Sequence, residues 1–232
     1  MSNLKGTEKY ISENLLFNNI DNKLVSEISE LVRYEEIYCD EELFSHFDCQ
    51  SGIIIFTEGV VKWKVIDVNG EERIIKYFGK SDSIVVDRVL DLFDGPQTFE
   101  VVQPVKAIYI SKDIIEKISD EQPLFRLNLL GMVSRKADEF ESRAGKLVNT
   151  PVKERMLESI KELIEKFGLN DSKQLRIPMT KKDMCQLLSA SKSSVNRLIQ
   201  EFQTKNLMEF QRNKLLIKDS NKIQNYWEVL ES

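Results

Sequence analysis

The sequence predicts a mixed α+β fold with a cupin-like β-barrel, then a long helix, then a winged helix-turn-helix. Three observations predict it. Short β-branched and aromatic segments, separated by glycines, lie between residues 53 and 110. Apolar residues then recur at steps of three and four from Leu130 to Leu147. Finally, residues 180–206 contain two short helices joined by a tight turn, and the first begins with a capping box.

Length and composition are those of an ordinary globular protein. The chain has 232 residues, enough for two modest domains, with 41% hydrophobic and 31% charged residues. Three scattered cysteines do not suggest a disulfide framework. No apolar run approaches the length of a membrane span, and the N-terminus lacks an apolar signal core. We therefore expect a cytoplasmic protein without a membrane partner.

The histidine content excludes several enzyme classes. One histidine in the whole chain disfavours a Ser-His-Asp hydrolase and excludes a multi-histidine metal site. An enzyme built on the cupin-like barrel would lack its metal triad for the same reason. The sequence therefore predicts a protein that is not an enzyme.

The first domain is expected to span residues 1–122. Its first 35 residues have the apolar spacing of helices, and the pattern changes from about Tyr38. Asn69-Gly70 predicts a type I′ hairpin turn, because that turn needs two residues that tolerate positive φ. Many short strands with frequent turns are typical of an antiparallel barrel. The strands are expected at 53–56, 60–65, 74–78, 99–102 and 105–110.

A dimerisation helix is expected at residues 123–149. The heptad spacing is that of a helix packed along a partner helix, and its two alanines would allow close approach. The alternative is that the helix lies on its own barrel, since short heptad runs are often simply amphipathic. The expected interface consists of Leu130, Val133, Ala137, Phe140, Ala144 and Leu147.

The last domain is expected to span residues 150–232. Thr150-Pro151 has the form of a helix cap followed by the first helical residue. Thr180 and Asp183 have the spacing of a capping box, which starts the first helix of the pair. The remaining elements are expected as a helix at 152–167, a short strand at 174–177, helices at 180–188 and 191–206, and a hairpin wing of 207–211 and 215–218.

The second helix of the pair has two distinct faces. Its apolar residues suit packing on its own domain, and its polar face suits the major groove of DNA. The expected base contacts are Lys192, Ser193, Asn196 and Arg197. The expected phosphate contacts are Lys181, Lys182, Ser191, Ser194, Arg212 and Lys214.

Charge is distributed unevenly along the chain. Residues 173–218 carry ten Lys and Arg against three Asp and Glu, a net of +7, although the whole chain carries −5. Residues 150–232 hold 15 basic and 11 acidic side chains, which leaves 18 and 27 for residues 1–149. Phosphate binding depends on the local field rather than on the net charge. A solvated basic face without a partner is the alternative.

Together these features resemble the Crp/Fnr superfamily of bacterial transcription regulators over nearly the whole chain. In that family the recognition helix begins Ser-Arg-Glu-Thr-Val-x-Arg, and residues 191–197 here read Ser-Lys-Ser-Ser-Val-Asn-Arg. Lys192 and Arg197 therefore carry over as DNA contacts. Ser193 stands where the family commonly has a glutamate, so we expect a different half-site or less strict reading of one base pair.

The resemblance also implies partners and a mode of control. It implies a homodimer on a near-palindromic, double-stranded operator, with RNA polymerase as a further partner. It implies that the first domain is of the cyclic-nucleotide-binding type and senses a signal. Such a signal would shift the population of dimers whose recognition helices are correctly spaced.

The effector is not identified by the sequence. Residues 84–99 lack the Gly-Glu and Arg-Ser pairs with which family members bind a cyclic phosphate, so we expect no cyclic AMP binding. The N-terminal half has only Cys39 and Cys49, too few to hold an iron–sulfur cluster. Haem, a small organic ligand and a thiol oxidant stay open.

Cys39, His46 and Cys49 form a weak metal-site candidate. Their spacing and ligand number fall short of the usual zinc patterns, and a redox switch between the two cysteines is an equally open alternative. Two further readings of the whole chain also stay open. In the first, the barrel and the helix pair form a module that binds another protein instead of DNA. In the second, the protein is a constitutive regulator without a ligand.

Overall fold

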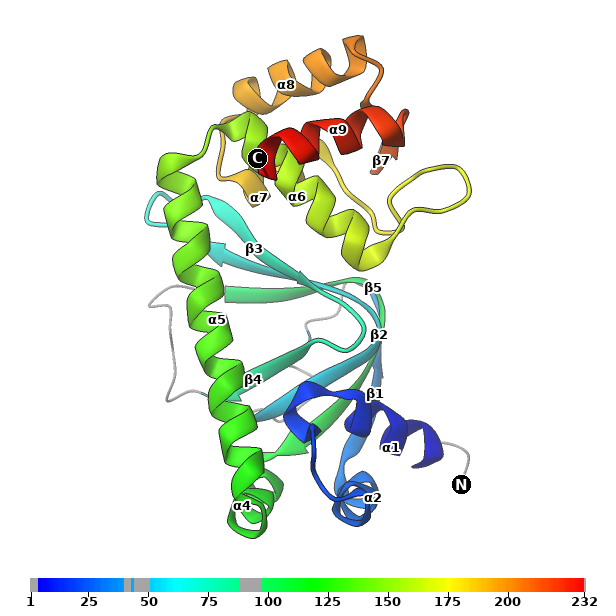
Figure 1. The fold of residues 1–232 in the computed structure, drawn as a ribbon, viewed down its shortest axis with the longest axis vertical. Coiled ribbons are helices and arrows are strands. Elements are labelled where there is room, and N and C mark those ends of the chain that lie inside the picture. Colours follow the sequence, from blue (N-terminus) through cyan, green and yellow to red (C-terminus); the bar gives the residue numbers. More distant parts are fainter. Residues whose placement is uncertain (1–3, 40–42, 44–50, 88–96, 232) are drawn as a thin grey trace. The chain divides into compact units, whose positions relative to one another are not determined.

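The computed structural model describes residues 4–39, 43, 51–87 and 97–231 (Figure 1). The chain divides into two compact units. The first consists of residues 1–63 and 77–141, and the second of residues 64–76 and 142–232. Within the described ranges, no helix is both long and apolar enough to cross a lipid bilayer.

The first unit begins with short helices and continues as a sheet (Figure 1). The helical segments are α1 (Leu4–Glu13), η1 (Leu15–Phe17) and α2 (Asn22–Leu31). The strands are β1 (Arg33–Ile37), β2 (Ser51–Ile66), β3 (Glu72–Phe78), β4 (Ser83–Asp87) and β5 (Gln97–Ser111). Residues 64–76, which include the end of β2, its connection to β3 and most of β3, belong to the second unit.

The strands form one five-stranded sheet in the order β1-β5-β2-β3, with β4 also paired to β2. β1 runs antiparallel to β5, with Arg33 opposite Tyr109, and β4 runs antiparallel to β2, with Ile54 opposite Ile84. β1 and β4 were not among the expected strands, and β1 begins within the first 35 residues that were expected to be helical. Both strands are short and gain their hydrogen bonds from distant partners, so their local sequence signal is weak.

The two faces of the sheet bury separate apolar cores. Alternate residues of β2 and β5 point to opposite faces, as the pleat requires. One core holds the short helices against the sheet and includes Ile11, Phe17, Ile28, Ile53, Ile110 and Phe125. The other includes Ile37, Ile54, Phe56, Phe78, Phe99 and Val105.

The connection between β2 and β3 differs from the expected two-residue turn. It has five residues, from Asp67 to Glu71, and Gly70 has a φ of +78°. The Asp67 carboxylate accepts hydrogen bonds from the backbone N–H groups of Asn69 and Glu71 at 2.9 and 3.0 Å. A side-chain acceptor therefore organises this loop, and Asn69 does not need the positive φ of a type I′ turn.

Two further helices follow the sheet, α4 (Lys112–Glu121) and α5 (Pro123–Asn149). In the second unit, α6 (Val152–Phe167) has the expected bounds and ends at Gly168 with a φ of +73°, but its N-cap is Pro151 rather than the expected Thr150. Helices α7 (Lys181–Leu188) and α8 (Lys192–Thr204) precede the strands β6 (Met208–Gln211) and β7 (Lys214–Ile217), and α9 (Ser220–Glu231) ends the chain.

The strand expected at residues 174–177 is present only as isolated bridges. Gln174 pairs with Leu216, and Leu175 pairs with Leu169. Leu175 and Ile177 are nevertheless buried. The apolar pattern therefore predicted burial correctly. The segment lies beside β7, where the backbone N–H of Leu175 donates to the carbonyl of Leu215 at 2.8 Å, but these contacts do not extend into a regular ladder.

Candidate nucleic-acid interface

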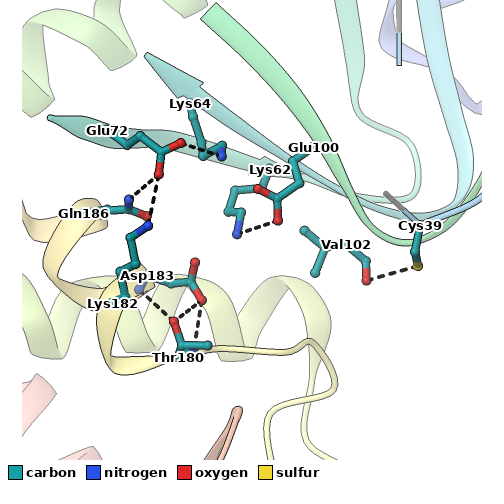
Figure 2. A network of polar contacts seen from close by, with 10 residues as sticks. All are labelled: Cys39, Lys62, Lys64, Glu72, Glu100, Val102, Thr180, Lys182, Asp183 and Gln186. Atoms are coloured by element: carbon teal, nitrogen blue, oxygen red, sulfur yellow. Dashed lines mark hydrogen bonds and ion pairs between the residues drawn. The ribbon is translucent and has the colours of Figure 1, made fainter. Parts of the chain in front are cut away.

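The first helix of the pair, α7, begins with the expected capping box (Figure 2). The hydroxyl of Thr180 accepts a hydrogen bond from the backbone N–H of Asp183 at 3.0 Å, and the Asp183 carboxylate accepts one from the backbone N–H of Thr180 at 2.8 Å. Both orphan donors are thereby satisfied. Lys181 and Lys182 follow in the first turn, and both side chains are exposed.

The second helix, α8, is capped by Ser191. Its hydroxyl accepts a hydrogen bond from the backbone N–H of Ser194 at 3.2 Å and lies 2.9 Å from the hydroxyls of both Ser193 and Ser194. Ser189, in the left-handed region at φ +47°, makes the turn between the helices. The serines that were expected to contact DNA therefore also shape the start of the helix.

α8 separates a buried face from an exposed one. Val195, Ile199 and Phe202 are fully buried or nearly so, and Leu198 is also buried. Lys192, Ser193 and Arg197 are exposed, and Asn196 is half-buried. The four expected base contacts thus lie off the packed face of the helix, on side chains that can donate to base edges.

The wing carries the two cationic side chains expected to meet phosphates. β6 and β7 pair antiparallel, with Gln211 opposite Lys214, so Arg212 and Asn213 form the tip. Arg212 has a φ of +54°, and both Arg212 and Lys214 are exposed. The backbone N–H of Met179 donates to the carbonyl of Asn213 at 2.8 Å, which anchors the tip beside the start of α7.

Arg155 is a positioning residue that sequence reasoning did not find. Its guanidinium donates to the carbonyl of Leu188, at the end of α7, at 2.6 Å, and to the carbonyl of Thr150 at 3.2 Å. Burial lowers the pKa of Arg155 from its ordinary value. The side chain therefore ties the segment between α5 and α6 to the turn of the helix pair. No local sequence motif predicts such a contact, because its acceptors are backbone carbonyls, which every residue has.

Glu201 connects three helices of this unit. Its carboxylate accepts from Lys153 of α6 and from Lys205, both at 2.7 Å. The ammonium groups of these two lysines also lie 5.9 and 5.7 Å from the ring centre of Tyr226 in α9. Hydrogen bonds from Lys153 and then Lys205 lower the pKa of Glu201 from its ordinary value of 4.5 to about 2.

This pKa predicts an acid-sensitive stabilisation of the unit. Because the carboxyl group has the lower pKa in the folded chain, its ionised form stabilises the fold above pH 4.5, and this contribution disappears as the pH falls towards about 2. We expect Glu201→Gln to lower the free energy of urea unfolding at pH 7 and to have little effect near pH 2. Glu162→Gln, which changes an exposed glutamate of α6, is the matched control. A Glu201→Gln deficit that stays constant with pH would contradict the assignment.

Five exposed cations lie on α7, α8 and the wing. Within the described part of the chain, none of the five takes part in an ion pair, whereas Lys182, Lys205 and Lys218 pair with Glu72, Glu201 and Glu209. Unpaired, exposed cations attract phosphate without first breaking an internal contact. The five are Lys181, Lys192, Arg197, Arg212 and Lys214.

The expected dimer residues lie along one side of α5 but differ in exposure. Leu130, Ala137, Ala144 and Leu147 are exposed, and Val133 is half-buried. Phe140 meets the ring of Trp63 edge-on, with 5.7 Å between ring centres. Phe140 therefore packs on the sheet of its own unit. Of the six expected residues, those that remain exposed are Leu130, Ala137, Ala144 and Leu147.

The N-terminal cysteines provide no described metal site. Cys39 is exposed, and its sulfur lies 3.6 Å from the carbonyl of Val102. His46 and Cys49 lie outside the described residues, as does most of the segment in which a cyclic phosphate would bind. Among the residues with described positions, no group of three metal-ligating side chains occurs. Cys185 is partly buried, and this burial raises the pKa of its thiol.

Sequence comparisons match this region to a known domain. Residues 154–226 match the family model of the Crp-like helix-turn-helix domain. A CRP-like cAMP-activated global transcriptional regulator of Mycobacterium tuberculosis is 21% identical over 90% of this chain and 94% of its own length. An anaerobic regulatory protein of Haemophilus influenzae is 22% identical over 82% of this chain and 74% of its own length.

Solved structures share the fold. A regulator of the Crp/Fnr family from Eubacterium rectale has a TM-score of 0.70 and 13% identity, and the match covers 92% of this chain and 97% of that one. FixK2 from Bradyrhizobium japonicum has a TM-score of 0.66 and 16% identity over 84% and 96%. These similarities confirm the α+β fold class and the resemblance to transcription regulators that are not enzymes.

Proposed function

We propose that this chain, a DNA-binding transcription regulator of the Crp/Fnr type, acts as a homodimer on a near-palindromic operator. The observation that carries the proposal is the exposed cationic face of α8, backed by a fully buried apolar face. Each subunit inserts the start of α8 into a major groove. The two half-sites then lie about one helical turn apart.

Side chains of the interface have different tasks. Lys192, Ser193, Asn196 and Arg197 face base edges, where donor patterns distinguish the base pairs. The phosphate contacts fix the register of the protein on the duplex and carry no sequence information. They are Lys181, Lys182, Ser191, Ser194, Arg212 and Lys214.

Dimer formation is supported by the exposed apolar stripe of α5. Leu127, Leu130 and Val148 have exposed fractions of 64, 65 and 84%, and the small Ala137 and Ala144 lie between them at heptad spacing. Such a stripe loses its contact with water when a second copy packs along it. Phe140, which borders this stripe, packs on Trp63 and so holds the helix to its own unit.

The first unit supplies the regulatory input in this proposal. An effector that favours one arrangement of the α5 helices shifts the population of dimers that are competent for DNA. The similarities assign no effector to this chain, and haem is among the open choices. RNA polymerase is the proposed further partner, and the cytoplasm is the proposed compartment.

Two substitutions distinguish base reading from phosphate contact. We expect Arg197→Ala to cost about 1–3 kcal/mol of operator binding and to relax specificity at one base pair. We expect Lys214→Ala to weaken binding to every duplex alike and to reduce the salt slope by about 1. Fluorescence anisotropy with duplexes enriched by random-DNA selection, at several salt concentrations, measures both effects.

The same measurements can refute the proposal. Indistinguishable effects of Arg197→Ala and Lys214→Ala on all duplexes would contradict base reading by α8. A selection that enriches no sequence motif would instead favour a helix pair that binds another protein.

A further inference from the structure

Glu72, the first residue of β3, holds two side chains of α7 (Figure 2). One oxygen of its carboxylate accepts from the amide nitrogen of Gln186 at 2.9 Å and from the ammonium nitrogen of Lys182 at 3.3 Å. The other oxygen accepts from Lys64 of β2 at 3.0 Å. The tip of the β2–β3 hairpin and the helix pair belong to the same compact unit.

The donors that meet Glu72 are those that a DNA phosphate requires. Lys182 and Gln186 are four residues apart in α7, so their side chains lie on one face of the helix. An ammonium group and an amide N–H both bind anionic oxygen, whether it belongs to a carboxylate or to a phosphodiester. In helix-turn-helix proteins this first helix crosses the DNA backbone.

Building on the DNA binding proposed above, we propose that Lys182 and Gln186 form a binding site for one backbone phosphate of the operator. In the DNA-free protein the carboxylate of Glu72 occupies this site. DNA and the β2–β3 hairpin therefore compete for the same two donors. Gln186, which the sequence did not single out, becomes a phosphate contact.

The exposure of the contact makes it a reversible competitor. The side chains of Glu72 and Lys182 are 37 and 76% exposed, so water and salt weaken their attraction. Gln186 is only 8% exposed, so its amide N–H would be left without an acceptor if the hydrogen bond to Glu72 broke. Leaving a buried donor unpaired is costly, and the amide therefore needs a new acceptor when Glu72 leaves. A phosphate, with its full charge and several oxygens, can supply the replacement acceptor.

Acidity does not control the exchange near neutral pH. Hydrogen bonding from Lys64, then from Gln186, lowers the pKa of Glu72 to about 2, so the carboxylate stays charged. Lys64 keeps the carboxylate paired when α7 leaves it. In this proposal, a movement of the β2–β3 hairpin changes the access of DNA to Lys182 and Gln186. The position of the hairpin is thereby coupled to DNA affinity.

Removing the competing carboxylate tests the inference. We expect Glu72→Ala to raise operator affinity about fivefold at moderate salt, since an exposed ionic contact of this kind is worth about 1 kcal/mol at most. Glu71→Ala removes the same charge from the neighbouring residue, whose side chain is 65% exposed and pairs with Arg73. It should change affinity less than about twofold because solvent screens it.

A second substitution tests the phosphate site directly. In the Glu72→Ala background, Gln186→Met removes the amide donor without a large change in side-chain length. We expect it to lower operator affinity by about tenfold or more, the worth of one hydrogen bond to a charged acceptor. Circular dichroism and thermal unfolding confirm that each variant is folded.

Hydrogen–deuterium exchange without DNA provides an independent readout. Glu72→Ala should speed exchange in residues 64–76 and 180–188, and Glu71→Ala should not. Equal DNA affinities of the Glu72→Ala and Glu71→Ala variants, with normal binding by the wild type, would overturn the competition alone. Absence of duplex binding by the wild type and every variant would overturn the proposed function, and the phosphate site with it.

Discussion

Leu130→Glu is expected to convert the protein from a dimer to a monomer and to weaken operator binding by about 10²–10⁴-fold. The side chain of Leu130 is 65% exposed in the single subunit and lies in the apolar stripe of α5. In the proposed dimer, this substitution would place a glutamate of each subunit in an apolar contact, where two like charges repel one another and lose water. In a dimer, binding of one subunit to its half-site holds the other subunit at a high effective concentration near the second half-site. The affinity falls because a monomer lacks this linkage.

Sedimentation and anisotropy measure the two consequences separately. Ser142→Glu introduces the same side chain at an exposed position of α5 that points away from the stripe, and it should leave the dimer intact. The monomeric variant should bind a half-operator as well as the wild type does. A Leu130→Glu protein that sediments as a dimer and binds the full operator normally would refute the proposed interface.

Phe202→Ala is expected to destabilise the helix-turn-helix by about 3–5 kcal/mol, which is comparable with the whole stability of a small domain. The Phe202 ring is completely buried between α8 and its neighbours. Lys153 of α6 places its ammonium group 6.0 Å from the ring centre. The cavity left by the ring removes contacts on several sides at once, and neighbouring helices cannot close it fully.

Denaturant unfolding with local probes measures this effect. We expect the second unit of the chain to unfold at lower urea concentration, with loss of operator binding before the first unit unfolds. Gln203→Ala, at the next residue and on the exposed face, should change stability by less than about 0.5 kcal/mol. Equal effects of the two substitutions would show that α8 does not pack as described.

The features that the sequence predicted well depend on neighbours along the chain. The capping box of Thr180 and Asp183, the Ser191 cap and the apolar face of α8 each follow from spacings within one or two turns. The spacing of residues decides which side chains share a helix face, and the start of a helix always leaves backbone N–H groups that need a cap. The exposed polar face of α8 was predictable for the same reason.

The features that the sequence missed depend on contacts between distant residues. β1 and β4 exist because β5 and β2 offer them partners, whereas the segment expected as a strand at 174–177 makes only isolated bridges. The β2–β3 loop follows from the reach of one aspartate, Asp67, rather than from Asn69-Gly70. Contacts of this kind are set by where chain segments meet, which a single sequence does not state.

By itself the sequence determined a helix pair with one buried and one cationic face, because both the periodicity and the caps are local. Only the tertiary structure decided which cations are available to DNA. It leaves Arg197 and Lys214 without ion pairs among the described residues, and it places Lys182 against Glu72, 110 residues away. The reason is electrostatic: the availability of a charge depends on the distance to its counter-charge in space, not on their separation along the chain.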